Sequence, residues 1–282
     1  MTAAPGLVVV TGASTGIGRA TARHLAQAGF YVLAGVRTDA AAETVAAEGV
    51  EPVRIDIADP DQIARLAQRV ADDPEGRPLQ ALVNNAGIAV AAPVEVIPLD
   101  EWRRQFEVNL FGHVAVIQAL LPALIASRGR IVNVSSIGGL VAGPTYGAYS
   151  GSKFALEAVS DALRREVRHL GVEVVLVEPG AIATPIWEKG LATAKGLTDK
   201  MTAEQRERYR QITAAAGRRA QQAARDGVPP EQVARVITDA VTARRPRTRY
   251  LVGRDARITA RLAALLPDRV MDRMISGGST RS

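Results

Sequence analysis

Tyr149 and Lys153 are the residues whose types and spacing first suggest chemistry, since they end the stretch Tyr-Ser-Gly-Ser-Lys. On a helix, two residues at this spacing share one face. A free tyrosine phenol loses its proton only near pH ~10, but a neighbouring ammonium favours the phenolate and lowers that pKa. The pair can then act as a proton donor and acceptor near neutral pH.

The use of lysine supports this interpretation. The chain has 35 Lys plus Arg, but only four are lysines, and three of these (Lys189, Lys195 and Lys200) lie in one polar segment. Everywhere else the chain uses arginine, whose charge is spread over a planar fork and not held at a compact point. Lys153 is therefore a candidate functional lysine, although a Tyr-Lys pair on a wet helix face is the alternative.

The first element that must position such a pair is a glycine-rich turn. An apolar run at 7–10 leads into Thr-Gly-Ala-Ser-Thr-Gly-Ile-Gly at 11–18, and a helical apolar pattern follows as far as Gly29. Glycine lets the backbone approach a pyrophosphate, and the helix N-terminus offers free N–H groups. An ordinary glycine turn is the alternative. The turn residues that we expect to bind phosphate are Gly12, Ser14, Gly16, Ile17 and Gly18.

The end of the next strand, expected over 31–36, bears on the choice of nucleotide. An acidic residue there would bond the adenosine 2′-hydroxyl of NAD, whereas an arginine would accept the 2′-phosphate of NADP. The chain has Arg37, with no carboxylate before Asp39. This favours NADP(H) over NAD(H), with NAD(H) still allowed, because Thr15 adds no second cation and Arg37 could simply be solvated.

Strand and helix patterns then alternate along the chain, which predicts an α/β fold with a doubly wound parallel sheet. Further strands are expected over 53–57, 79–83, 131–136 and 172–177, with a seventh entered from the basic stretch 244–253. The strand 53–57 would bring Asp56 and Ile57 to the adenine. A proline helix start follows at Asp59-Pro60.

Three further strand ends and helices carry polar residues of interest. The strand over 79–83 leads into Asn-Asn-Ala-Gly, whose members Asn84, Ala86 and Gly87 could lie against a ring. Asn109 falls inside a helical stretch from about 100 to 127, where asparagine is unfavourable; it is either buried and bonded, or a local kink. The strand over 131–136 ends in Ser136, thirteen residues before Tyr149.

Taken in order, these motifs resemble the classical short-chain dehydrogenase/reductase family over about residues 5–185, and more weakly through 253. The resemblance rests on Thr-Gly-x-x-x-Gly-x-Gly at 11–18, Asn-Asn-Ala-Gly at 84–87, the tetrad Asn109, Ser136, Tyr149 and Lys153, and Pro-Gly at 179–180 followed by Thr184. It implies a Rossmann-type fold with a seven-stranded parallel sheet flanked by helices, and an NAD(P)(H)-dependent oxidoreductase of alcohols and ketones or aldehydes.

The resemblance also implies a role for each tetrad member. Tyr149 would be the general acid or base, and Lys153 would lower its pKa and bond the nicotinamide ribose. Ser136 would hold the substrate oxygen, and Asn109 would bend its helix and anchor a water. Residues expected beside the nicotinamide and its phosphates are Pro179, Gly180, Ile182 and Thr184.

The last third of the chain is expected to add a substrate loop and a tail to the domain at 1–253. Residues 183–228 lack strand-like stretches, and Val141 and Trp187 near the tetrad predict an apolar pocket for a steroid, a retinoid or a long-chain carbonyl compound. Residues 254–282 form the expected extension, in which 255–275 reads as one basic amphipathic helix. Packing on the body or on a partner subunit is favoured over binding to a membrane. This tail resembles the hydroxysteroid and retinol dehydrogenase-like branch.

Composition excludes several other classes. The chain has no cysteine, so disulfides and thiolate sites are ruled out, and three scattered histidines do not suggest a metal site. The charge of +6 allows an acidic partner, but arginines are dispersed and aromatics are only 4%, which is unlike a nucleic-acid surface. The apolar run at 7–10 is too short for a signal or a membrane span. We expect a cytoplasmic homodimer or homotetramer, the assembly being implied by the family.

Two other functions were weighed. A nucleotide-binding protein that has lost catalysis and acts as a redox sensor or interaction partner would be expected to lack a tetrad member, and none is missing. The extended relatives that act as epimerases or dehydratases have a glycine motif one residue shorter. The reaction direction and the physiological substrate do not follow from the sequence.

Overall fold

Seven parallel strands form the sheet of this protein, in the order β3-β2-β1-β4-β5-β6-β7. The structure is a computed structural model, and it describes residues 6–275. The strands are β1 (Leu7–Val10), β2 (Tyr31–Val36), β3 (Val50–Arg54), β4 (Leu79–Asn84), β5 (Arg130–Val134), β6 (Glu173–Pro179) and β7 (Arg249–Val252). The order reverses between β1 and β4, and a ligand crevice is expected at the carboxyl ends of the strands there. The predicted seven-stranded parallel sheet is confirmed.

Alternate residues of each strand face two apolar layers. Val8 and Val10 belong to a core cluster with residues of α1 (Gly16–Gln27), α2 (Asp39–Val45) and α9 (Pro230–Thr242). Leu7 and Val9 belong to a second cluster, with residues of α3 (Pro60–Ala71), α5 (Gly112–Ser127) and α6 (Gly147–Val167). Since successive strand side chains point to opposite faces, this buries both sides of the sheet and fixes its register.

Several strand boundaries differ from the prediction, and two of these differences concern predicted site residues. The strand expected over 53–57 is β3 at Val50–Arg54, where Val32 pairs with Val50 and Val36 with Arg54. The prediction was wrong because Ile55 and Ile57 are buried just beyond the strand end, so their burial imitates a strand pattern. Likewise β5 ends at Val134, so Ser136 stands in the following turn and not in the strand.

The stretch expected to be helical from 100 to 127 is helical throughout, but one turn of it is a π-helix. It consists of α4 (Leu99–Phe106), a π-helical turn at Glu107–Phe111, and α5. By length and composition, Leu99–Ser127 could cross a membrane, with a mean hydropathy of 1.8. Its buried polar side chains Gln105, Asn109 and His113 all bond to backbone within 86–90, as expected of a helix packed inside a globular protein.

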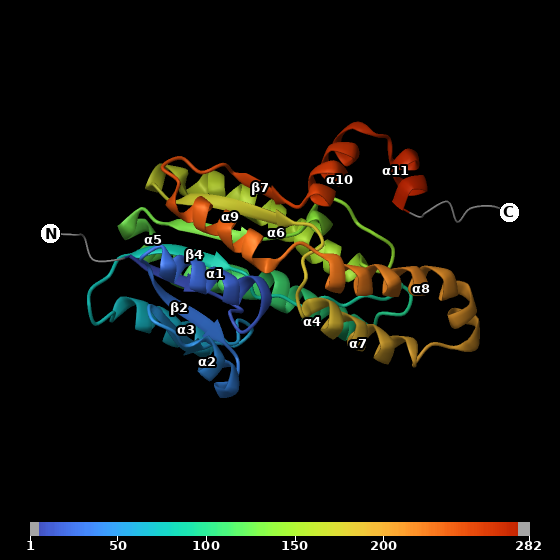
Figure 1. The fold of residues 1–282 in the computed structure, drawn as a ribbon, viewed down its shortest axis with the longest axis horizontal. Helices are drawn as coiled ribbons and strands as arrows, with labels where there is room; N and C mark the ends of the chain where they lie inside the picture. Colours follow the sequence, from blue (N-terminus) through green and yellow to red (C-terminus); the bar gives the residue numbers. More distant parts are fainter. Residues whose placement is uncertain (1–5, 276–282) are drawn as a thin grey trace.

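The insertion after β6 is helical, as predicted. It forms α7 (Ile186–Thr198) and α8 (Ala203–Asp226), which lie side by side and extend beyond the end of the sheet (Figure 1). Thr202 and Gln205 make a reciprocal capping box that fixes the start of α8. A bridge between Ile182 and Val228 closes the base of the insertion onto the core.

The tail differs from the single amphipathic helix that the sequence predicted. It forms α10 (Arg254–Leu265) and α11 (Asp268–Ile275), separated by an extended Leu266. Pro267 explains the break, because proline lacks an N–H and drives the preceding residue out of the helical region. The part of the predicted extension at 276–282 lies outside the described residues.

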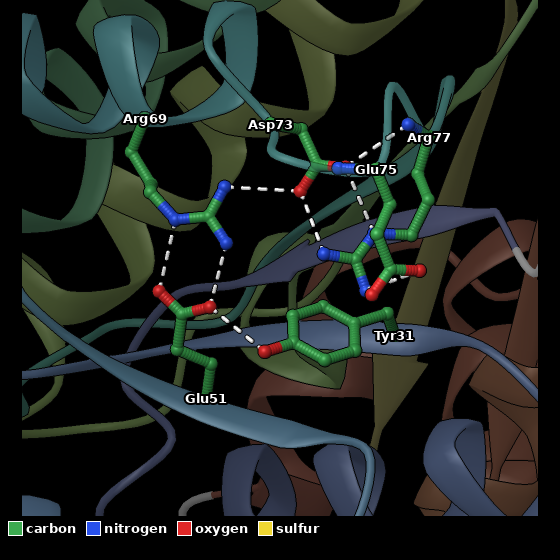
Figure 2. A network of polar contacts seen from close by, with 6 residues as sticks. All are labelled: Tyr31, Glu51, Arg69, Asp73, Glu75 and Arg77. Atoms are coloured by element: carbon green, nitrogen blue, oxygen red, sulfur yellow. Dashed lines mark hydrogen bonds and ion pairs between the residues drawn. The ribbon is translucent and has the colours of Figure 1, made fainter.

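A network of ion pairs lies near the amino-terminal ends of the strands, opposite the expected crevice (Figure 2). Arg77 bonds Asp73 at 2.8 Å and stacks 3.6 Å above the ring of Tyr31. Arg69 bonds Glu51 at 2.6 Å, and the Tyr31 hydroxyl donates to Glu51 at 2.9 Å. The network therefore ties β2, β3 and the end of α3 together, and the Arg77 side chain lowers the pKa of Asp73.

Candidate active site

A cavity of about 550 Å³ opens at the carboxyl ends of the strands. Most of the residues predicted from the sequence line it, together with segments that follow β1 to β6. The predicted residues in its lining are Gly12, Ser14, Gly16, Ile17, Arg37, Asp56, Ile57, Ala86, Gly87, Ser136, Tyr149, Lys153, Pro179, Gly180, Ile182 and Thr184. Three predicted residues are not part of this lining but pack against or bond segments next to it: Gly18, Asn84 and Asn109.

The turn after β1 has the shape that a nucleotide pyrophosphate requires. Gly12 has φ +66°, and a Cβ on it would lie 2.7 Å from the Cα of Ala86. A Cβ on Gly18 would lie 2.3 Å from the carbonyl oxygen of Gly12, so the start of α1 packs directly under the turn. The N-cap residue Thr15 makes no side-chain capping bond. The first N–H groups of α1 are therefore available to an anion, and the residues present fit a nicotinamide dinucleotide.

Thr11 and Asn85 brace this turn against the end of β4. The Thr11 hydroxyl oxygen accepts hydrogen bonds from the backbone N–H groups of Asn85 (3.0 Å) and Ala86 (3.1 Å). The Asn85 amide donates to the carbonyl oxygens of Thr11 (3.0 Å) and Gly12 (3.1 Å). The sequence analysis included both residues in motifs but did not predict these bonds, because a threonine at a strand end is common and its partners are more than 70 residues away.

Asn84 is buried inside the protein and does not reach the cavity. Its Nδ2 donates to Oδ1 of Asn133 at 3.0 Å, and Asn133 donates in turn to the Ser160 hydroxyl at 2.8 Å. Asn84 is the last residue of β4. Its amide therefore links β4, β5 and α6 below the site, whereas Ala86 and Gly87 come to the surface of the cavity.

Tyr149 and Ser136 meet at the centre of the cavity. Tyr149 lies in the first turn of α6, and Ser136 ends the turn after β5, where its Oγ accepts from the backbone N–H of Gly138 at 3.0 Å. Burial raises the pKa of the Tyr149 phenol, and a hydrogen bond with Ser136 lowers it in part. The expectation of a depressed phenol pKa is thus wrong, because desolvation outweighs the stabilisation of the phenolate.

Lys153 lies one turn after Tyr149 and is almost fully buried. Its Nζ donates to the carbonyl oxygen of Val134 at 2.8 Å. Burial lowers the pKa of Lys153 to about 8, while the charge of Glu157 acts in the opposite direction. An amine with this pKa is still mostly protonated at pH 7, so Lys153 is a buried cation at the cavity wall.

The sequence predicted that Asn109 is either buried and hydrogen-bonded or at a local irregularity of its helix. Both descriptions apply, since it is fully buried and lies in the π-helical turn. Its Oδ1 accepts from the N–H of Ile88 at 2.9 Å, and its Nδ2 donates to the carbonyl oxygen of Ile88 at 3.0 Å. Nδ2 also approaches the Ser152 hydroxyl at 3.2 Å, and Ser152 donates to the carbonyl oxygen of Tyr149 at 2.7 Å. The extra residue of a π-turn often marks a functional site.

His113 was not predicted as a site residue. Its Nε2 is 2.7 Å from the carbonyl oxygen of Ala86. Burial, with a smaller contribution from the charge of Lys153, lowers the pKa of His113 to about 3. The ring is therefore neutral, and it donates from Nε2 to Ala86, which holds the cavity-lining segment at 86–87 in place.

An ionic cluster behind Lys153 was also missed by the sequence analysis. Arg249 of β7 bonds Glu178 at 2.6 Å, Asp161 at 3.1 Å, and also Glu157, which lies one turn after Lys153 on α6. Burial and the charge of Glu157 raise the pKa of Glu178 to about 6. The cluster joins α6, β6 and β7 behind Lys153. The sequence does not predict it, because an arginine at the start of a strand is not in itself a sign of an ionic cluster.

The adenosine end of the cavity contains Arg37, Asp56 and Ile57. The first carboxylate after Arg37 in the sequence, Asp39, is absent from the cavity lining and pairs with Arg54 at 2.6 Å. Arg37 is exposed and lines the cavity just beyond the end of β2.

The opposite end of the cavity is bounded by segments from the last third of the chain. Asp255 of α10 accepts a hydrogen bond from the N–H of Ala181 at 2.8 Å, and Thr259 lines the cavity beside it. The Trp187 indole donates to the carbonyl oxygen of Ile182 at 2.6 Å. The site therefore includes the first turn of the tail, which the sequence analysis treated as separate from it.

Comparisons with known proteins agree with this geometry. The profile described as short chain dehydrogenase matches residues 6–195. The chain is 38% identical to the 3-amino-tetrahydro-pyrrolizinone reductase of Xenorhabdus hominickii, with 89% of this chain and 87% of the relative aligned. It is 36% identical to the NADPH-dependent 3-dehydrocapnine reductase of Ornithobacterium rhinotracheale, over 94% of each. It is 35% identical to mouse (Mus musculus) retinol dehydrogenase 5, over 97% of this chain and 89% of the relative.

Solved structures share the whole fold. A short chain dehydrogenase from Burkholderia cenocepacia J2315, in complex with NADP, superposes with a TM-score of 0.75 at 25% identity, over all of both chains. A short chain dehydrogenase/reductase from Burkholderia phymatum, in complex with NAD, superposes with a TM-score of 0.78 at 26% identity, over 98% of this chain and 97% of the other.

Proposed function

The chain belongs to the classical short chain dehydrogenase family, in its retinol and hydroxysteroid dehydrogenase-like branch, and we propose that Tyr149 is the residue that exchanges the proton in its reaction. It is an NAD(P)-dependent oxidoreductase that interconverts alcohols and carbonyl compounds. The observation that carries the proposal is that Tyr149, Ser136 and Lys153 line one cavity with the glycine turn.

Each residue of the site has a distinct task in this proposal. The bound nicotinamide supplies or takes up the hydride. Ser136 and the Tyr149 hydroxyl bond the substrate oxygen, and Tyr149 donates the proton to it, or removes the proton in the reverse direction. Lys153 binds the nucleotide ribose and stabilises charge that develops on the phenol. Asn109 positions α6 through Ser152.

Carbonyl reduction is the direction that we propose. A phenol with a raised pKa is protonated at neutral pH and is ready to give its proton to a carbonyl oxygen. Alcohol oxidation would first require this phenol to lose its proton, which burial disfavours. The names of two relatives, both reductases, agree with this direction.

We propose NADP(H) as the preferred cofactor, with NAD(H) as a poorer substitute. Arg37 lines the cavity at the adenosine end, and Asp39 is held by Arg54. An exposed guanidinium can bond a 2′-phosphate with two hydrogen bonds, whereas the 2′-hydroxyl of NAD gives it little to bind. The remaining predicted residues that line the cavity, within 12–17, 56–57, 86–87 and 179–184, would serve either cofactor.

The substrate that we propose is apolar. Val141, Ile186 and Trp187 line the same cavity as Tyr149. They suit a hydrocarbon body better than a sugar, whose hydroxyls would be left unpaired. The relative retinol dehydrogenase 5 is named for such a substrate.

We propose one domain at 1–253 and an extension from 254, as the sequence predicted. The extension contributes Asp255 to the site, which the sequence did not predict.

The last part of the proposal concerns the location, the oligomeric state and the partners of the enzyme. We propose a cytoplasmic homodimer or homotetramer that binds neither nucleic acid nor, for its function, a membrane. The basic residues are dispersed, and α10 lies against β7 and the turn at 137–139.

A screen of carbonyl compounds tests the proposal. Purified protein is mixed with NADPH or NADH and a panel of apolar ketones, aldehydes and small sugars, and the loss of absorbance of the reduced cofactor is followed. We expect turnover of apolar carbonyls with NADPH and much slower turnover with NADH. Cofactor binding without turnover of any compound would favour the catalytically silent alternative, and comparable turnover of sugars would contradict the apolar substrate.

A further inference from the structure

A second cavity, of about 360 Å³, adjoins the active site beneath the insertion. Its walls are α7, α8 and the loop segments at 89–92 and 145–146, and Figure 1 shows the two helices running side by side beyond the sheet. We call it the tail chamber. The residues that line it are Ala89, Ala91, Ala92, Thr145, Tyr146, Ile186, Trp187, Gly190, Leu191, Ala194, Lys195, Thr198, Asp199, Thr213, Ala214, Ala216, Gly217 and Ala220. Its volume falls in the range of about 300–1,000 Å³ that is usual for ligand pockets.

The tail chamber is continuous with the active site at a neck of shared residues. Ala89, Tyr146, Ile186 and Trp187 line both cavities. The ring of Tyr146 lies 6.3 Å from the ring of Tyr149, at an angle of 73°. A molecule whose carbonyl lies at the Tyr149 hydroxyl therefore has the neck within a few bond lengths.

The lining of the tail chamber is small and apolar. Alanine and glycine make up half of it, on both helices and on the loop at 89–92. The hydroxyls of Thr198 and Thr213 donate to carbonyl oxygens of their own helices, at 2.8 Å to Ala194 and 2.9 Å to Tyr209. They do not need a polar partner from a ligand, so the chamber selects a hydrocarbon.

The two ends of the chamber differ in their exposure to solvent. At the neck, Thr145 has φ +70°, a strained conformation for a β-branched residue, and its buried Oγ1 has no hydrogen-bond partner among residues 6–275. Such strain is typical of ligand clamps. At the other end Lys195 and Asp199 are exposed, so the chamber reaches the surface there. A long apolar chain that enters at the neck would therefore lie along the alanine and glycine wall, with its far end near the surface.

We propose that the tail chamber binds the unbranched aliphatic tail of a long-chain aldehyde or ketone, whose carbonyl lies at Tyr149. This inference rests on the proposed function and narrows its substrate class. A flexible chain can pass the neck of four side chains and fill both cavities. A rigid fused-ring ketone would fill the first cavity only and would gain nothing from the second.

Gly217 offers a way to fill the chamber without disturbing the fold. It lies within α8, and a Cβ built on it meets no atom of residues 6–275 within 4 Å. Gly217→Leu therefore places a side chain in the open space and also removes a helix-destabilising glycine. Gly196→Leu is the matched control, because Gly196 is an exposed glycine within α7, meets no atom within 4 Å, and is absent from the linings of both cavities.

The first measurement is kcat/KM with NADPH for butanal and dodecanal. In the natural protein and in Gly196→Leu, we expect dodecanal to be the better substrate. In Gly217→Leu we expect kcat/KM for dodecanal to fall by about 10- to 100-fold, because several methylenes lose their apolar contacts, while the value for butanal stays the same. Equal chain-length profiles in all three proteins, or a preference of the natural protein for a fused-ring ketone over dodecanal, would overturn the inference.

The second measurement does not depend on turnover. The bromine of 12-bromododecan-1-ol quenches a nearby indole, and Trp187 lines the tail chamber. We expect saturable quenching in the natural protein and in Gly196→Leu, and its loss in Gly217→Leu and in Trp187→Phe. Quenching that is absent, or that persists in Gly217→Leu, would refute the chamber as a tail site. Saturable quenching in a protein that reduces no carbonyl would uphold the chamber and refute the proposed redox function.

Discussion

Burial sets the protonation of three side chains around the site. It raises the pKa of Tyr149, lowers that of Lys153 to about 8, and lowers that of His113 to about 3. In each case the low-dielectric interior disfavours the charged form. The phenol and the imidazole are therefore neutral at pH 7, and Lys153 is the group whose charge changes closest to neutrality.

Lys153 gives a pH dependence whose sign can be stated. Below about pH 8 the ammonium of the free enzyme is charged and attracts the nucleotide; above it the charge is lost. The affinity for NADPH should therefore fall by up to about tenfold per pH unit above this value. Titration of NADPH fluorescence on either side of pH 8 checks this. Lys153→Met should bind more weakly and show no such dependence, and a constant affinity in the natural protein would contradict the assignment.

Arg37 should decide between the two cofactors. Arg37→Ser removes the charge-assisted hydrogen bonds to the 2′-phosphate, so the dissociation constant of NADPH should rise by about 10- to 100-fold. Binding of NADH should be nearly unchanged. Isothermal titration with each cofactor measures both values, and an equal loss for NADH would show that Arg37 acts on the fold and not on the phosphate.

The sequence predicted most of the residues that meet in the cavity, because glycines, a Tyr-Lys pair and strand-end amides are local signals. It could not predict Thr11, His113 or Asp255, whose roles depend on partners at Asn85, Ala86 and Ala181 that only the fold brings near. It also gave the wrong direction for the pKa of Tyr149, since burial is not visible in a spacing.

Helices and strands were predicted well where one face is apolar and poorly at their ends. β2 was predicted at its observed bounds, whereas β3 was shifted because Ile55 and Ile57 are buried outside the strand. The π-helical turn at Glu107–Phe111 has no sequence mark except the unfavourable Asn109. The break between α10 and α11 follows from Pro267, and an apolar periodicity that continues across a proline hid it.

The ion-pair network of Figure 2 should support the sheet without affecting the chemistry. The Arg77 and Asp73 side chains are only 3% and 2% exposed. Arg77→Met leaves the Asp73 carboxylate buried without its main partner and should lower the free energy of unfolding by about 3–5 kcal/mol. Urea unfolding measures this, and kcat of the folded enzyme should be unchanged.

Arg54→Met is the control for that substitution. Its ion pair with Asp39 is 54% and 86% exposed, so its loss should cost less than about 1 kcal/mol. Equal losses of stability in the two variants would show that the network is no stronger than a surface pair.

The molecule as a whole leaves two aromatic side chains uncovered, one in the π-helical turn before α5 and one on α6. Phe111 is 55% exposed and Phe154 on α6 is 44% exposed. Exposed aromatic residues of this kind are typical of interaction surfaces. The double variant Phe111→Glu, Phe154→Glu should therefore shift the molar mass measured by light scattering from an oligomer to a monomer.

Leu265→Glu provides the comparison. Leu265 is 80% exposed but lies at the end of α10, in the tail. The Leu265→Glu variant should have the same oligomeric molar mass as the natural protein. Dissociation by this variant, with none by the double variant, would place the interface on the tail instead.

The account as a whole depends on the phenol of Tyr149 as the proton donor next to the nucleotide cradle. Tyr149→Phe, assayed for carbonyl reduction and for NADPH binding in the same preparation, tests it most directly, with Tyr146→Phe as the matched loss of a neighbouring hydroxyl. We predict that kcat/KM falls by about 10²- to 10⁴-fold in Tyr149→Phe, that NADPH binds as before, and that Tyr146→Phe keeps most of the activity. Full turnover in Tyr149→Phe would contradict the account.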